Sequence, residues 1–174
     1  MDHVSVRWLT QARKRNALDN FTSDGIWRPD VTVACIVPRG TRFLLVEEQV
    51  HGELVLNQPA GHLEPAESLC AAAVRETLEE TGWTVQLDAL VGIYQWTNSG
   101  SNSHFLRFTF AAQPVRHDPA RKLDVGIVRA LWMTRDEVAA QGRRLRSPMV
   151  LRGLDDYLAG RRQPLDSLVA LTAS

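Results

Sequence analysis

Three glutamates stand close together in a stretch whose composition favours an α-helix. Glu76, Glu79 and Glu80 are spaced i, i+3 and i+4, so at ~100° per residue their side chains project within about 100° of arc. Like charges at this spacing repel by roughly 0.2–0.5 kcal/mol per pair, and the negative end of the helix dipole lies nearby. A divalent cation would convert the repulsion into binding, whereas the alternative is an acidic face that only meets solvent. From the helix alone, both interpretations stay open.

The helix that carries the glutamates is predicted over residues 68–81. Ser68 is a suitable N-cap, because its hydroxyl can accept a hydrogen bond from a backbone N–H of the first turn. Gly82 is placed to end the helix in the left-handed conformation, which glycine adopts at little cost. The apolar side, predicted to point away from the glutamates and to pack on a sheet, consists of Ala71, Val74 and Leu78.

Apolar and β-branched runs predict strands on both sides of this helix. Residues 31–37 are nearly all apolar, as is typical of a buried strand. Further strands are predicted at 42–46, 53–56, 84–87, 89–96, 105–111 and 127–133. Strands and helices interleave without a regular βαβ rhythm. We therefore expect one α/β domain, with a mixed sheet and helices on both faces.

Two closing helices are predicted from their N-terminal signals. Thr134 and Glu137 form a capping box for a helix that ends near Gly142. Ser147 is a cap followed by proline at the first helical position, for a helix that runs to residue 158. Residues 31–170 are expected to form the domain. Residues 1–30 are expected to be an N-terminal extension with a short helix at 13–18.

The composition excludes several classes of protein. The chain has 174 residues, 44% of them apolar, and 20 basic residues balance 20 acidic ones, so nothing draws it as a whole to nucleic acid or an anionic membrane. Its apolar runs are far shorter than the ~20 residues that cross a bilayer, and no secretory signal is recognised. Cys35 and Cys70 lie in apolar surroundings and are predicted to be buried free thiols, which favours a cytoplasmic location.

The residues around the glutamates form a longer pattern of fixed spacing. Gly61 is followed after five residues by Glu67, and after seven more by Arg75-Glu76-Thr77-Leu78-Glu79-Glu80-Thr81-Gly82-Trp83. This pattern resembles the Nudix box, with Thr77 at one position where the family has a bulky apolar residue. The resemblance implies an α/β/α sandwich with a catalytic loop–helix–loop. It also implies hydrolysis of organic diphosphates that requires Mg²⁺ or Mn²⁺.

The resemblance assigns roles to individual residues. Glu79 and Glu80 resemble the principal metal ligands, and the carbonyl of Gly61 resembles a further one. Glu76 resembles the carboxylate that is either a ligand or the general base, and both roles stay open. Arg75 resembles the arginine that holds a box glutamate by ion pairing. Glu67 is an additional box position, for which a carboxylate favoured by the helix dipole is the alternative.

Further segments resemble the NudJ branch of the family. They are residues 31–35, 46–48, 57–64, 95–96, 105–108, 145–148 and 164–165. This branch implies activity on nucleoside tri- and diphosphates and on hydroxymethylpyrimidine diphosphate and thiamine diphosphate. Another Nudix specificity, for sugar nucleotides or dinucleotides, is the first alternative. A Nudix module that binds a ligand without catalysis is the second.

Four residues outside the box are predicted to contact a small-molecule substrate. Trp96 can stack on a base or pyrimidine ring, although a tryptophan at the rim of the core is the alternative. Arg107, charged in an otherwise apolar strand, suits a phosphate unless alternation places it in solvent. Gln58 and Gln95 are candidates for reading the edge of a ring. A monomer and a homodimer are both compatible with the sequence.

Overall fold

The computed structural model describes residues 26–171, and two small sheets lie at its centre. The first sheet has the order β5 (Ala60–His62), β1 (Asp30–Ile36), β7 (Ser103–His117) and β6 (Trp83–Asn98). Strands β1 and β7 are parallel, whereas the other two pairs are antiparallel, so the predicted mixed sheet is confirmed. The second sheet is antiparallel and contains β2 (Pro38–Arg39), β3 (Arg42–Val50), β4 (Glu53–Asn57) and β8 (Ile127–Thr134).

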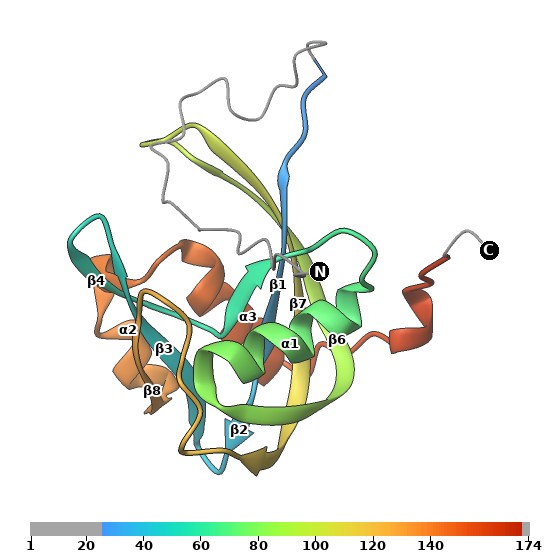
Figure 1. Ribbon diagram of the computed structural model, residues 1–174. Helices are drawn as coiled ribbons and strands as arrows, with labels where there is room; N and C mark the ends of the chain where they lie inside the picture. Colours follow the sequence, from blue (N-terminus) through green and yellow to red (C-terminus); the bar gives the residue numbers. More distant parts are fainter. Residues whose placement is uncertain (1–25, 172–174) are drawn as a thin grey trace, which may run out of the picture.

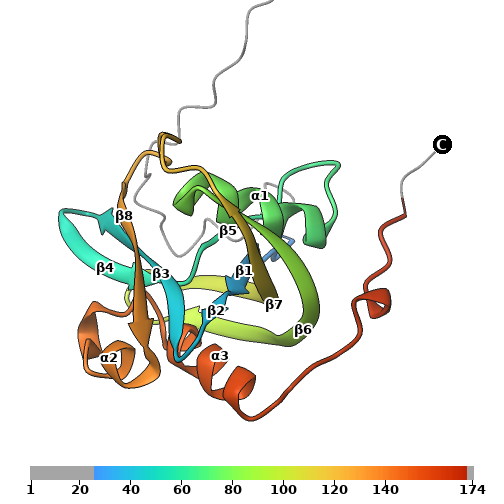
Figure 2. The ribbon, with the colours of Figure 1, turned by 90° about the horizontal axis from the view of Figure 1, so that it is seen from below.

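Helices cover both faces of the strands. Helix α1 (Leu69–Thr81) lies on one side, and α2 (Arg135–Ala139) and α3 (Pro148–Leu158) lie on the other, as Figures 1 and 2 show. Two 3₁₀ turns, η1 (Gly142–Arg144) and η2 (Leu165–Ser167), complete the described elements. This is the expected α/β/α arrangement. Within the described residues, no helix has the length and apolar content needed to cross a bilayer.

Strand β1 separates two hydrophobic cores because its side chains alternate. Val33 and Cys35 belong to the core under α1, whereas Ile36 belongs to the core under α2 and α3. A strand buried on both faces reads as a continuous apolar run, which is why residues 31–37 are so apolar. The cysteines are free, as predicted, but Cys70 is only half-buried. Burial raises the pKa of the Cys35 thiol to about 12.

Several predicted boundaries differ from the structure. The two strands predicted at 84–87 and 89–96 are one strand, β6, because an irregularity in pairing with β7 between Leu87 and Ala89 bends the strand without ending it. The Thr134 capping box is confirmed, but α2 ends at Ala139 and a 3₁₀ turn follows. Ser147 precedes α3, yet its hydroxyl is buried and makes no capping hydrogen bond. The helix predicted at 13–18 lies outside the described residues.

Candidate active site

Helix α1 begins and ends as its sequence predicts. The hydroxyl of Ser68 accepts a hydrogen bond from the N–H of Ala71 (3.1 Å), and Gly82 ends the helix with φ 71°. The prediction for its packing side is right only for Val74, which is partly buried against the core, whereas Ala71 is exposed and Leu78 is only partly buried. The buried residues are instead Ala72, Ala73, Thr77, Glu80 and Thr81. The buried stripe therefore lies beside the carboxylates, which brings part of the acidic cluster against the sheet.

Thr77 replaces the bulky apolar residue of the motif without leaving an unpaired hydroxyl. Its side chain is fully buried, and the hydroxyl donates to the carbonyl of Ala73, one turn earlier (2.8 Å). The same carbonyl accepts from the thiol of Cys35 on β1 (3.5 Å). Buried hydroxyls are tolerated when they are hydrogen-bonded, so the departure at this position removes no contact that the acidic cluster requires.

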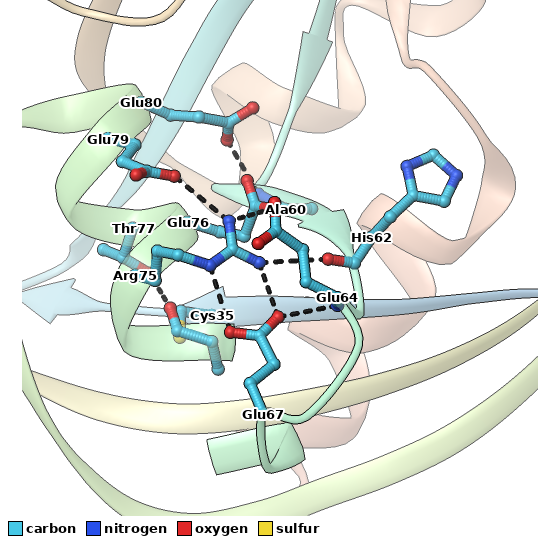
Figure 3. Close-up of polar contacts among 11 residues, drawn as sticks. Cys35, Ala60, His62, Glu64, Glu67, Arg75, Glu76, Thr77, Glu79 and Glu80 are labelled. Atoms are coloured by element: carbon cyan, nitrogen blue, oxygen red, sulfur yellow. Dashed lines mark hydrogen bonds and ion pairs between the residues drawn. The ribbon is translucent and has the colours of Figure 1, made fainter. Parts of the chain in front are cut away.

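Arg75 ties three carboxylates and a loop together. Its guanidinium donates to Glu67 from two nitrogens (2.7 and 3.1 Å), to Glu76 (2.8 Å) and to Glu79 (3.1 Å). It also donates to the carbonyl of His62 on β5 (3.1 Å), as Figure 3 shows. The hydrogen bond from Arg75, against a smaller effect of burial, holds the pKa of Glu67 below its usual value. The planar fork of arginine suits this arrangement, because a lysine could not hold the same bidentate geometry.

The carboxylate of Glu76 occupies space that only glycine leaves open. A Cβ at position 61 would lie 2.0 Å from the carboxylate carbon of Glu76. Burial raises the pKa of Glu76, and the charges of Glu79 and Asp124 add to this, although Arg75 opposes it. Gly61 is therefore required for the close approach of β5 and α1, which is a physical reason for glycine at this position of the motif.

Glu80 faces inward from the same helix. Its side chain accepts a hydrogen bond from the N–H of Ala60 on β5 (2.8 Å), and the residue is 8% exposed. Burial raises its pKa well above the usual value, and the charges of Glu76, Glu48 and Asp124 act in the same direction. A second positive charge close to these carboxylates would therefore stabilise their ionised forms.

Two further carboxylates adjoin the cluster, and we call these residues together with Glu76, Glu79 and Glu80 the acidic site. Glu48 on β3 has a buried oxygen, Oε1, with no hydrogen-bond partner among the described residues. Asp124 donates its backbone N–H to the carbonyl of Glu79 (3.1 Å) and lies in the segment before β8. Asp124 carried no signal in the sequence, since it follows the box by more than forty residues.

The neighbour of Glu48 has a different role. The carboxylate of Glu47 accepts from Arg129 (2.8 Å) and from Arg144 (2.6 Å), so both its oxygens are engaged. The hydrogen bond from Arg129 is the largest cause of its lowered pKa. Adjacent residues of a strand point to opposite faces, which explains why one glutamate joins β3 to β8 and η1 while the other adjoins the acidic site.

Arg107 lies beside the acidic site rather than in solvent. The residue is 6% exposed, and its Nη1 donates to Asn57 (3.3 Å) while Nε contacts the hydroxyl of Thr32 (3.5 Å). Burial lowers its pKa to about 10, against the opposing charges of Glu48 and Glu80, so it stays cationic at neutral pH. Within residues 26–171 these two long contacts engage only part of the five-donor guanidinium, which leaves capacity for an anion.

The other predicted substrate residues lie elsewhere. Gln58 is 1% exposed, and its amide donates to the carbonyl of Val150 (3.0 Å), so it supports α3 from within the core. Gln95 is exposed on β6. Trp96 is half-buried, stacks on Phe105 with ring centres 5.5 Å apart, and lines a cavity beside α3. The structure therefore joins the box residues and Arg107, whereas the side-chain amide of Gln58 is engaged by α3 and Gln95 is exposed.

The donor set of the acidic site has the chemistry that a hard divalent cation prefers, since its ligand atoms are carboxylate and backbone oxygens. Among the described residues, no three acidic, cysteine or histidine side chains are already gathered around one point as metal ligands. Arg75 holds Glu76 and Glu79, and Glu80 accepts from Ala60. Oε1 of Glu48 has no hydrogen bond among the described residues and lies 3.7 Å from Arg146, and Glu80 is 8% exposed, so both carboxylates would gain from a further positive partner.

Comparison with known proteins agrees with this geometry. The NUDIX domain family matches residues 27–152. Phosphatase NudJ of Escherichia coli K12 is 39% identical over 143 residues, which cover 82% of this chain and 92% of that protein. A solved NUDIX hydrolase from Nitrosomonas europaea is 49% identical with a TM-score of 0.83, over 84% of this chain and all of the other. A UDP-X diphosphatase, 18% identical with a TM-score of 0.64 over 80% of this chain and 68% of its own, shares the fold alone. With its box residues gathered on α1 and β5 and its match to these enzymes, the chain belongs to the Nudix hydrolase family.

Proposed function

We propose that this enzyme hydrolyses organic di- and triphosphates with Mg²⁺, and that Mn²⁺ can replace it. Nudix hydrolases act on small-molecule diphosphates and generally use divalent metals. The observation that carries the proposal is the acidic site itself, where clustered carboxylates, one with an oxygen that has no hydrogen bond among the described residues, stand beside the cationic Arg107. Glu79, Glu80 and the carbonyl of Gly61 would hold the metal, and Glu76 and Glu48 are the candidates for further ligands.

The metal, when bound, neutralises charge on the diphosphate and acidifies a water molecule. The remaining tasks belong to the chain. Arg75 fixes the orientation of Glu76, and Glu67 in turn fixes Arg75. Glu76, unless it serves as a ligand, takes the proton of the attacking water as general base. Arg107 donates to a phosphate oxygen of the substrate, for which its guanidinium is suited.

The proposed substrates are nucleoside tri- and diphosphates, hydroxymethylpyrimidine diphosphate and thiamine diphosphate. The support is the 39% identity to Phosphatase NudJ over most of both chains. A panel of these compounds, with sugar nucleotides and dinucleotides, should be incubated with Mg²⁺ and the products identified. Release of phosphate or pyrophosphate supports the proposal. Cleavage of sugar nucleotides into two monophosphates, with no turnover of the other compounds, would replace it.

The metal site is tested by two conservative substitutions. Glu79→Gln and Glu80→Gln keep the shape of each side chain, and the amide oxygen at position 80 can still accept from Ala60. We expect each variant to fold and to lose at least ~100-fold in kcat, as is typical when a charge-stabilising group is removed. Calorimetric titration with Mg²⁺ should show weakened binding in both. Near-normal turnover by both variants would contradict the assignment.

We also propose a location and a catalytic unit. The two free cysteines are compatible with a reducing compartment, and we place the enzyme in the cytoplasm. Residues 31–170 are proposed as the catalytic unit, since the elements from β1 to η2 fall almost entirely within them. A chain that begins at residue 26 should keep full activity if this is correct, and sedimentation of the full chain will distinguish a monomer from a homodimer.

A further inference from the structure

A cavity of about 620 Å³ lies between the end of β6 and the segment that connects α2 to α3. Its volume falls in the range of small-molecule sites, roughly 300–1,000 Å³. Trp96 supplies one wall, and apolar side chains, two arginines, a serine and an aspartate supply the others. Its lining includes Trp96, Leu145, Arg146, Pro148, Leu151 and Arg152.

The cavity is joined to the acidic site through Arg146. The guanidinium nitrogen Nε of Arg146 lies 3.7 Å from Oε1 of Glu48, the carboxylate oxygen that has no hydrogen-bond partner in the described chain. The backbone N–H of Arg146 donates to the carbonyl of Leu56 on β4 (2.8 Å), which fixes the segment next to Asn57 and Arg107. Arg107 and Arg146 are near enough for their charges to interact. A molecule whose diphosphate reaches the acidic site can therefore extend past Arg146 into the cavity.

The walls favour a flat ring over a flexible alkyl chain. Trp96 is held against Phe105, so one face of a rigid aromatic plane is already supported. Two residues earlier, the hydroxyl of Tyr94 donates to Asp156 of α3 (3.0 Å), which anchors this strand to the helix. Leu145, Pro148 and Leu151 add apolar surface beside Trp96. An aromatic heterocycle gains from stacking and needs few polar partners.

The charges of the cavity indicate where the anionic end lies. Arg152 is paired with Asp156 (2.9 Å), and Asp155 is paired with Arg135 (2.9 Å), so these groups are largely neutralised. In the described part of the chain, the guanidinium of Arg146 has a single ion pair, the 3.7 Å contact with Glu48, and it stands on the side of the acidic site. Its charge is therefore the one best placed to meet the phosphate nearest the ring.

Building on the function proposed above, we infer that this cavity is the specificity site for an aromatic heterocycle joined to the diphosphate. Trp96 stacks on the ring, and Arg146 binds the phosphate next to it. The site thus selects ring-bearing diphosphates over alkyl diphosphates, while the acidic site handles the diphosphate that all of them share. Nucleotides and pyrimidine diphosphates without a ribose both have this chemistry.

The test compares three substrates in matched variants. Uridine diphosphate and hydroxymethylpyrimidine diphosphate carry a ring, whereas isopentenyl diphosphate does not. We expect Trp96→Ala to lower kcat/KM by ~10-fold or more for a ring-bearing substrate, in line with measured base–aromatic stacking, and by less than about 3-fold for isopentenyl diphosphate. Trp96→Phe should restore most of the loss. Gln86→Ala, at an exposed position of the same strand, is the control.

A second pair of variants tests the arginine. Arg146→Gln should raise KM for the ring-bearing substrates by ~10-fold, whereas Arg143→Gln, an exposed arginine of η1 outside the cavity lining, should not. A loss of kcat/KM confined to one ring-bearing substrate also supports the inference. It shows whether the cavity accepts the nucleotide or the pyrimidine diphosphate without a ribose. An equal loss for all three substrates in Trp96→Ala, or no loss for any, would overturn it.

Binding of product separates this inference from the proposed function. Uridine monophosphate and hydroxymethylpyrimidine monophosphate can be titrated into the full chain by calorimetry, without turnover. Binding that weakens in Trp96→Ala supports the cavity even if no diphosphate is hydrolysed, in which case only the proposed function fails. If the enzyme hydrolyses diphosphates but neither monophosphate binds more weakly to Trp96→Ala, the inference about the cavity is wrong and the proposed function stands.

Discussion

Replacing Gly61 with alanine should separate catalysis from folding. The new Cβ would lie 2.0 Å from the carboxylate carbon of Glu76 and 2.1 and 2.2 Å from its two oxygens. An ordinary nonbonded carbon contact needs ~3.5 Å, so the carboxylate carbon must withdraw by about 1.5 Å. The backbone presents no obstacle, since Gly61 is not one of the glycines with positive φ. The whole strain therefore falls on the Glu76 side chain.

The expected magnitudes differ widely for stability and activity. The displaced group is the end of a flexible side chain, so a shifted rotamer should cost about 1 kcal/mol of unfolding free energy. Its hydrogen bond from Arg75, now 2.8 Å, must lengthen or break. Misplacing a reacting group by about 1 Å can cost roughly 100-fold in rate, and we predict a fall of this size in kcat/KM for Gly61→Ala.

The assay combines urea unfolding with steady-state hydrolysis of a diphosphate in Mg²⁺. Gly100→Ala is the matched control, because its Cβ would meet only Oδ1 of Asn98 at 3.4 Å. This control should keep wild-type activity and nearly wild-type stability. Activity of Gly61→Ala within about 3-fold of the wild type would refute the reasoning, since it would mean that the position of the Glu76 carboxylate is unimportant.

Three further substitutions test other parts of the site and its support. Arg75→Lys should lower kcat by roughly 10- to 100-fold, because one ammonium group cannot replace the contacts to Glu67, Glu76 and Glu79. Steady-state kinetics will measure the activity of this variant, and circular dichroism will check its fold. Arg107→Met should raise KM for diphosphates by ~10-fold or more with a smaller effect on kcat, since a charge-assisted hydrogen bond to the substrate is lost. An unchanged KM would exclude the contact between Arg107 and a phosphate. For Asp156, burial opposes ionisation, but hydrogen bonds from Arg152 and Tyr94 outweigh it and hold the pKa below its usual value. The ionised Asp156 therefore adds to the free energy of unfolding above the unfolded pKa of about 3.9. This contribution is lost as pH falls through the lower pKa of the folded state. Urea unfolding between about pH 5 and pH 2 should thus show a shallower loss of stability in Asp156→Asn than in the wild type.

The sequence alone was sufficient for features that depend on local spacing. The helix with its Ser68 and Gly82 caps follows from rules that act within a few residues. The run of residues 31–37 indicated a buried strand for the same reason, since alternation and hydrophobicity are local. The fixed spacing from Gly61 to Gly82 identified the family, and with it the residues gathered by Arg75.

The rotation of α1 on the sheet could not be read from its sequence. Apolar spacing suggested that Ala71, Val74 and Leu78 faced the core. Ala73 and Thr77 are the buried positions instead, and of the predicted three only Val74 packs against the core. Small side chains let the helix approach β1 and β5 closely, and this places Glu76 over Gly61 and Glu80 on the amide of Ala60. Helix periodicity defines which residues share a side, but packing against a partner decides which side is buried.

Only the tertiary structure brings distant residues to the acidic site. Glu48, Asp124 and Arg107 come from β3, the segment before β8, and β7, so no local pattern could group them with Glu80. Conversely, Gln58 adjoins the motif in sequence but its amide supports α3 from within the core. The physical reason is that spacing along the chain determines directions within one element, whereas strand register and the closure of two cores determine which elements meet.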